Sequence, residues 1–182
     1  NGPQSYQRPR SLVRSTSPAD AIDIFARSGL ARSGWALHVV GVGAQAAALR
    51  HQAASSGAAA AIRFLGFRAD VPELMGQAGI LLAPNPAEHL GLSVVEAMAA
   101  GLPVVAAGAA GHLETVGLVP SATLYPPGDL DAAGAVLAEL AADPAARAAY
   151  AEAARAVQRE HFTLERQVEQ TDAVYRRVLG RS

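Results

Sequence analysis

The stretch Pro84–Gly111, PNPAEHLGLSVVEAMAAGLPVVAAGAAG, decides the fold of this 182-residue chain. It opens as a loop that carries Glu88 and reaches Gly91. Glycine lets the backbone turn sharply and approach a ligand closely, so Gly91 marks the end of a binding loop. The stretch therefore begins as a loop that can hold a ligand against the main chain.

A helix and a strand follow this loop. Leu92–Ala100 has apolar residues at Leu92, Val95 and Met98–Ala99, which is a helical spacing. Gly101 is placed to end the helix in the position after its last turn. The apolar run Val104–Ala107 that comes next is typical of a strand buried on both faces.

Glu88 and Glu96 flank the start of the expected helix, with seven residues between them. The free N–H groups and the positive dipole end of a helix N-terminus favour an anion such as a phosphate. Carboxylates beside such a site can accept hydrogen bonds from sugar hydroxyls. The pair therefore suits a nucleotide-sugar, and we expect both carboxylates to line one cleft at the carboxyl edge of a parallel sheet.

Strands and helices alternate on both sides of this stretch, which predicts a parallel sheet covered on both faces. We expect a Rossmann-like α/β fold with five or six strands and a helical C-terminal tail. Residues 1–10 read as a linker. The expected strands are Ser11–Arg14, Ala36–Val40, Ala61–Leu65, Gly79–Ala83, Val104–Ala107 and Thr123–Tyr125. Ser17, Asp129, Asp143 and Thr163 stand where helix N-caps are expected.

The composition excludes several classes of protein. The formal net charge is −1 and the 15 basic residues, all arginine, are spread along the chain, which argues against a nucleic-acid surface. The absence of cysteine excludes disulfides and thiolate chemistry. No arrangement of His, Asp or Glu has metal-ligand spacing, so no metal and no cofactor are expected. Glu96, Gly101 and Pro103 interrupt the longest apolar stretch, so no transmembrane segment is expected.

The segment E-H-L-G-L-x-x-x-E-A-M-A-A-G-L-P-V-V resembles the E-x7-E motif of GT-B retaining glycosyltransferases, in particular the large family-4 group. Ala36–Gly43, Ile62–Gly66, Thr123–Asp129 and the closing segment Phe162–Leu179 are similar to further parts of that family. The resemblance implies that residues 11–182 are the C-terminal, donor-binding half of such an enzyme. The N-terminal acceptor domain would then be missing, so this chain alone would bind donor at most and catalyse little or nothing.

The resemblance also implies roles for residues of the motif. Glu88 would contact the hydroxyls of the donor sugar and is the expected catalytic residue. Glu96 would hold the ribose hydroxyls. Gly91 and Leu92 would offer backbone N–H groups to the pyrophosphate. His89 is also an expected substrate-binding residue of this loop, although the family more often has a small residue there.

Other expected binding residues lie outside the motif. Gly41 and Gly43 resemble the family's G-x-G loop near the nucleotide, and Phe67 and Arg68 lie where the family often contacts the base. Arg14 matches an arginine that neutralises the donor's phosphates. The Gly41–Gly43 loop also half-matches a dinucleotide fingerprint, but no acidic residue ends the following strand, which argues against a nicotinamide site.

The chain departs from the family at one cation. A lysine usually follows the phosphate-binding arginine by five or six residues, where this chain has Ala19 and Asp20. A transition-state cation can be worth several kcal/mol, so activity depends on whether another arginine, with Arg10 nearest in sequence, substitutes. The alternatives that stay open are a degenerate, non-catalytic GT-B-like binding domain and a GT-B sugar epimerase half.

The expected ligand is a nucleotide diphosphate sugar linked to UDP, GDP or ADP. The sequence does not decide the base, the sugar or the acceptor. The expected location is cytoplasmic, and peripheral attachment to a membrane through the missing N-terminal domain is left open.

Overall fold

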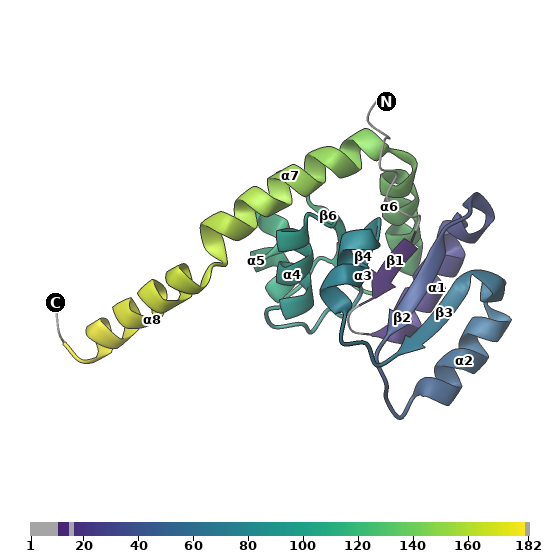
Figure 1. Cartoon of the computed structure of the whole chain (residues 1–182), viewed down its shortest axis with the longest axis horizontal. Coiled ribbons are helices and arrows are strands. Elements are labelled where there is room, and N and C mark those ends of the chain that lie inside the picture. The colour runs from purple at the N-terminus through teal and green to yellow at the C-terminus, as the bar shows by residue number, and fades with distance from the viewer. Residues whose placement is uncertain (1–10, 15–16, 181–182) are drawn as a thin grey trace.

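A six-stranded, fully parallel sheet forms the centre of the protein, with the strand order β3-β2-β1-β4-β5-β6 (Figure 1). The computed structural model describes residues 11–14 and 17–180, so the expected linker 1–10 lies outside the described residues. The strands are β1 (Ser11–Arg14), β2 (Ala36–Val40), β3 (Ile62–Gly66), β4 (Ile80–Ala83), β5 (Val104–Ala107) and β6 (Thr123–Tyr125). This order is that of a Rossmann fold, and it confirms the expected fold class.

Helices connect the strands and form the C-terminal tail. They are α1 (Pro18–Ser28), α2 (Ala46–Ser55), α3 (Val71–Gln77), α4 (Leu92–Ala100), α5 (Gly111–Glu114), α6 (Leu130–Ala142), α7 (Pro144–His161) and α8 (Leu164–Val178). Short 3-10 turns occur at η1 (Leu30–Ser33), η2 (Ala59–Ala61) and η3 (Val116–Leu118). Most expected boundaries agree with these within a residue or two. The single turn expected at His112–Val116 is instead divided between α5 and η3.

Each face of the sheet carries its own apolar core. Phe25 of α1 and Leu137 of α6 pack with Leu82 on one face. Met98 of α4 and Tyr150 of α7 pack with Leu81 on the other. Because successive side chains of a strand point to opposite faces, β4 is buried along its whole length, as expected for a central parallel strand.

The face of α4 that packs on the sheet differs from the apolar spacing seen in the sequence. Val94, Ala97 and Met98 are buried, whereas Leu92 is 70% exposed. Nearly every residue of this helix is apolar, so the spacing at 92, 95 and 98–99 was one of two possible stripes. Packing against the sheet and α7 selects the other one.

Three of the four expected N-caps are confirmed. The side chains of Asp129, Asp143 and Thr163 accept hydrogen bonds from the first-turn N–H groups of α6, α7 and α8. Ser17 was wrongly expected to cap α1. Its backbone has φ 59° and ψ 68°, a left-handed conformation, and its hydroxyl makes no capping bond.

The C-terminal tail leaves the body of the domain. α7 packs across α4, where Arg155 Nη1 donates to the Ala100 carbonyl at 3.3 Å. α8 then extends away from the sheet and buries none of its residues (Figure 1). Among the helices of the described residues, none is long and apolar enough to cross a bilayer.

Candidate functional site

The sheet places the Glu88 loop where its strand order reverses. β1 and β4 are neighbours, with Arg14 paired in register with Leu82. The chain leaves β1 toward α1 on one face and leaves β4 toward α4 on the other. In open parallel sheets, ligands bind beyond the carboxyl ends of the strands at this switch point. Glu88, in the connection from β4 to α4, therefore lies at the expected edge.

Local contacts hold the Glu88 loop in shape. The Ala87 N–H donates to Asn85 Oδ1 at 3.1 Å, and Asn85 Nδ2 lies 3.5 Å from Glu88 Oε2. Gly91 closes the loop with φ 71°, and a Cβ there would lie 3.3 Å from Glu88 Cγ. The positive φ favours glycine at this position, and a Cβ there would also press against the Glu88 side chain.

A second loop supports the first from behind. The Gly111 N–H donates to the Glu88 carbonyl at 2.9 Å. A Cβ on Gly111 would lie only 1.8 Å from the His89 carbonyl oxygen. Sequence reasoning did not assign this role to Gly111, although the glycine-rich run after β5 was a signal that some backbone approaches closely there.

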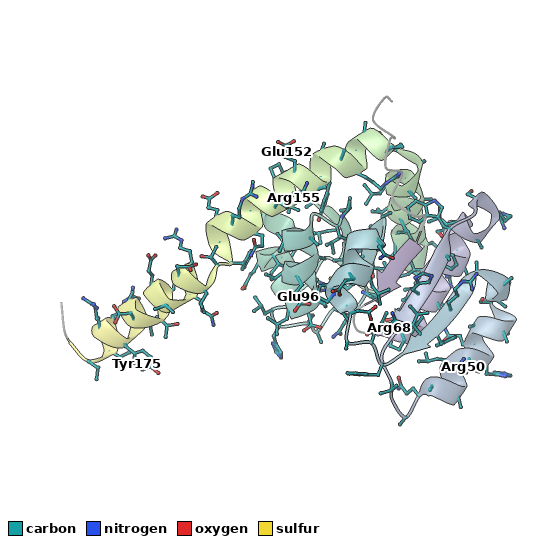
Figure 2. All side chains as sticks on the ribbon, in the orientation of Figure 1. Arg50, Arg68, Glu96, Glu152, Arg155 and Tyr175 are labelled. Carbon is teal, nitrogen blue, oxygen red and sulfur yellow. The ribbon has the colours of Figure 1, made fainter. Side chains whose placement is uncertain are left out.

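The start of α4 is exposed at Leu92, whereas Gly91 just before it is buried. Its first turn is bonded through the Gly91 carbonyl, which accepts from the N–H groups of Val94 and Val95. His89 and Leu92 are exposed around it. Glu96 is exposed one turn further along α4, where Figure 2 labels it. A shared cleft of Glu88 and Glu96 stays a prediction.

The loops after β2 and β3 form a second part of the same edge. The Gly41 N–H donates to the Gly66 carbonyl at 2.7 Å, with Gly41 at φ 117°. This bond brings Gly41 and Gly43 beside the loop that carries Phe67 and Arg68. Phe67 is 77% exposed, so its ring is open to a ligand.

Arg68 is engaged by a neighbour. Its Nε and Nη2 donate to the two carboxylate oxygens of Asp70 at 2.7 and 2.5 Å. The hydrogen bond from Arg68 holds the pKa of Asp70 below its ordinary value. Arg68, which Figure 2 labels, is thus partly neutralised by its own neighbour.

The expectation that few cationic side chains lie near the phosphates of a donor stays a prediction. The side chain of Arg14 lies outside what the structure describes, although its backbone ends β1. Ala19 is exposed in the first turn of α1, and its carbonyl accepts a hydrogen bond from Gln52 Nε2 at 3.0 Å. An exposed first-turn position is sterically open to a longer side chain.

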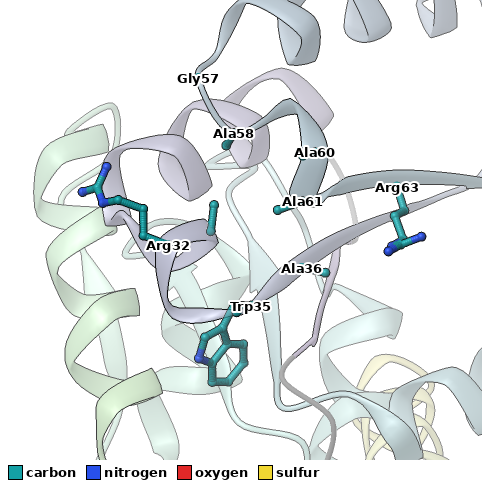
Figure 3. A pocket seen from close by; sticks show the side chains of 10 residues that line it. Arg32, Trp35, Ala36, Gly57, Ala58, Ala60, Ala61 and Arg63 are labelled. Carbon is teal, nitrogen blue, oxygen red and sulfur yellow. The ribbon is translucent and has the colours of Figure 1, made fainter.

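A hollow also lies at the opposite edge of the sheet (Figure 3). It is lined by the amino ends of β2 and β3 and by η1 and η2, including Arg32, Trp35, Ala36, Ala61 and Arg63. Alanines and the separate guanidinium groups of Arg32 and Arg63 line this hollow. No residue of the E-x7-E segment is among its lining residues. Among the described residues, no group of His, Asp and Glu could hold a metal ion.

The strand order and the crossovers on both faces define a Rossmann-type α/β domain. Residues 11–157 match the family described as "Glycosyl transferases group 1". This match covers most of the chain, so the chain belongs to that family. The resemblance found in the sequence is thereby confirmed.

Similar proteins support the assignment. A 2-deoxystreptamine glucosyltransferase of Streptomyces kanamyceticus is 35% identical over 145 residues, which are 79% of this chain and 38% of that protein. The structure of Anabaena Alr3699/HepE in complex with UDP is similar at 27% identity and a TM-score of 0.78, over 92% of this chain and 49% of that one. TarM of S. aureus, at 16% identity, shares the fold with a TM-score of 0.84 over 96% of this chain and 37% of its own. The chain therefore spans less than half the length of these relatives.

Proposed function

We propose that this chain is the donor-binding half of a retaining glycosyltransferase, which takes a sugar from a nucleoside diphosphate. The observation that carries the proposal is the position of the Glu88 loop. It leaves β4 beside β1 at the switch point and is held there by Gly111. A carboxylate beside a helix start fits a ligand that combines sugar hydroxyls with phosphates.

In this proposal each part of the edge binds one part of the donor. Glu88 accepts hydrogen bonds from the transferred sugar and is the catalytic residue. Glu96 binds the ribose, and the N–H groups of Gly91 and Leu92 bind the pyrophosphate. His89 borders the sugar in the same loop.

The remaining binding roles fall to the loops beside it. Gly41 and Gly43 let the backbone approach the nucleotide, while Phe67 and Arg68 contact the base. Arg14 neutralises the phosphates. UDP is the first nucleotide to test, because the similar HepE structures contain UDP, UDP with glucose, and UDP-glucose.

The acceptor site and the contacts on its side are assigned to an N-terminal domain outside this chain. The matched part of this chain covers less than half of these relatives, which leaves room for such a domain. The proposed consequence is that the 182-residue chain binds donor but transfers little or no sugar by itself. When the chain is joined to that domain, retention predicts that the product keeps the anomeric configuration of the donor.

A calorimetric titration of the chain with UDP, GDP, ADP and their glucose conjugates tests the proposal, with NAD as the comparison ligand. We expect one diphosphate and its sugar to bind and NAD not to bind. Glu88→Gln should weaken binding of the sugar conjugate more than binding of the free diphosphate, whereas Glu96→Gln should weaken binding of both. Glu73→Gln, at an exposed position of α3, is the matched control.

The alternative with specific support is a degenerate GT-B-like binding domain. It rests on Ala19 and Asp20, which stand where the resemblance places a lysine. A chain that binds no diphosphate or sugar conjugate in the titration would favour this alternative. A chain that binds NAD and no diphosphate would contradict both.

A further inference from the structure

His112 is a buried imidazole directly behind the Glu88 loop. It follows Gly111, whose N–H donates to the Glu88 carbonyl at 2.9 Å, and its side chain is 0% exposed. Glu88 and His112 are 24 positions apart in the sequence and meet only because β4 and β5 are neighbours. Nothing in the proposed donor contacts uses this ring.

The two ring nitrogens of His112 differ in their hydrogen bonding. His112 Nδ1 lies 3.0 Å from the Ala107 carbonyl oxygen. A carbonyl can only accept, so Nδ1 carries the proton and Nε2 of the neutral ring is an acceptor. Within the described part of the chain, Nε2 is buried without a hydrogen-bond partner. A buried acceptor without a partner is rare and needs an explanation.

The electrostatic surroundings keep the ring neutral while coupling it to Glu88. Burial lowers the pKa of His112 and outweighs the Ala107 carbonyl and the Glu88 charge, which both raise it. At neutral pH, Nε2 therefore presents a lone pair rather than a proton.

The neighbouring loop can supply the missing donor. Gly111, which directly precedes His112, contacts the backbone of Glu88 and His89, so the N–H groups of the 88–90 segment are the candidate donors for Nε2. A donor sugar that binds Glu88 would fix this segment in one conformation. The hydrogen bond to Nε2 would then form only when the sugar binds. It would stabilise the sugar-bound state and not the free chain.

We propose that His112 is a positioning residue for Glu88, in which Nε2 accepts a hydrogen bond from a backbone N–H of residues 88–90 once the donor sugar is bound. This inference rests on the proposed function of the Glu88 loop. His112 itself touches neither sugar nor phosphate. Its role is to hold the loop that presents the carboxylate.

Two substitutions separate the two nitrogens. His112→Asn keeps a donor near the place of Nδ1 and removes Nε2, whereas His112→Gln places an amide near Nε2 and loses the bond to Ala107. We expect H112N to lower the affinity for the sugar conjugate about tenfold more than the affinity for the free diphosphate. Tenfold is about the effect of one hydrogen bond. H112Q should retain most of that preference, although its melting temperature falls.

The measurement is calorimetric titration of the full chain with UDP and UDP-glucose, or with the matching GDP or ADP pair if that base binds. Thr115→Val is the matched control, because Thr115 Oγ1 donates to the Gly111 carbonyl at 2.8 Å and is buried in the same segment. It should lower the melting temperature without changing the ratio of the two affinities. A purely structural role for His112 would make H112N behave as T115V does.

A double variant tests whether His112 acts through Glu88. In E88Q/H112N, the ratio of the affinities for sugar conjugate and free diphosphate should fall as far as in E88Q alone, within about twofold. The reason is that the effects of substitutions at coupled residues do not add. Additive losses, or an unchanged affinity ratio in H112N, would overturn this inference while the proposed function stands. A parent chain that binds none of these nucleotides overturns the proposed function and this inference together.

Discussion

Replacing Gly111 by alanine should disturb the whole Glu88 loop. The added Cβ would lie 1.8 Å from the His89 carbonyl oxygen and 3.0 Å from the Glu88 carbonyl oxygen. An ordinary contact begins at 3.4 Å, so the two backbones must separate by about 1.6 Å. Both obstacles are main-chain atoms, and no side-chain rotation can relieve them.

The cost follows from two effects. Overpacking of a well-packed site costs about 1–3 kcal/mol, and the broken Gly111 to Glu88 hydrogen bond adds about 1 kcal/mol. We therefore expect a loss of about 2–4 kcal/mol in the free energy of unfolding. For a domain of this size, each kcal/mol lowers the melting temperature by about 2–4 °C, so a fall of roughly 4–16 °C is expected.

Thermal unfolding followed by circular dichroism measures this change, and titration with a nucleotide-sugar measures its effect on binding. Gly76→Ala is the control, because Gly76 lies within α3 with nothing within 4 Å of an added Cβ. A helical glycine replaced by alanine should raise stability by about 0.5–1 kcal/mol. If G111A melts like the parent chain and binds sugar conjugates equally well, the support of the Glu88 loop by Gly111 is refuted.

Three further substitutions test neighbouring parts of the site. Ala110→Gly should raise the melting temperature, because the backbone of Ala110 has φ 45° and ψ −133°. This conformation costs a residue with a Cβ about 1–3 kcal/mol. An unchanged melting temperature would contradict the strain. Asp70→Asn should release Arg68 from its ion pair and tighten diphosphate binding at low salt, and weaker binding would show instead that Asp70 orients the guanidinium. Ala19→Lys should tighten diphosphate binding by about tenfold to a hundredfold, the value of one charge-assisted contact of about 1.5–3 kcal/mol; an unchanged affinity would remove the missing lysine as a reason for weak binding.

Local sequence features were sufficient to predict most helices and strands and to find the E-x7-E segment. Gly101 and Pro103 separate α4 from β5 at the residues expected, because a helix end and a strand start depend on neighbours a few positions away. The alternation of such elements led directly to a parallel sheet. The family match over residues 11–157 confirms the resemblance to glycosyltransferases.

Ambiguous local signals were resolved by packing. The helix α4 is apolar on most of its surface, so its sequence allowed more than one buried face, and the sheet selected Val94, Ala97 and Met98. Ser17 has a side chain suited to capping, but the chain enters α1 in a left-handed conformation that leaves its hydroxyl out of the cap. In both places a long-range constraint outweighs the local preference.

The sequence by itself determined the order of strands and helices, the position of Glu88 before α4 and the likeness to a sugar-transferring family. Only the tertiary structure decided that Gly111 supports the Glu88 loop, that Gly41 is bonded to Gly66, and that His112 is buried with an Nε2 that has no hydrogen-bond partner among the described residues. The first two contacts join residues more than 20 positions apart. Such contacts depend on which strands become neighbours in the sheet, and a periodic pattern within one segment carries no information about that.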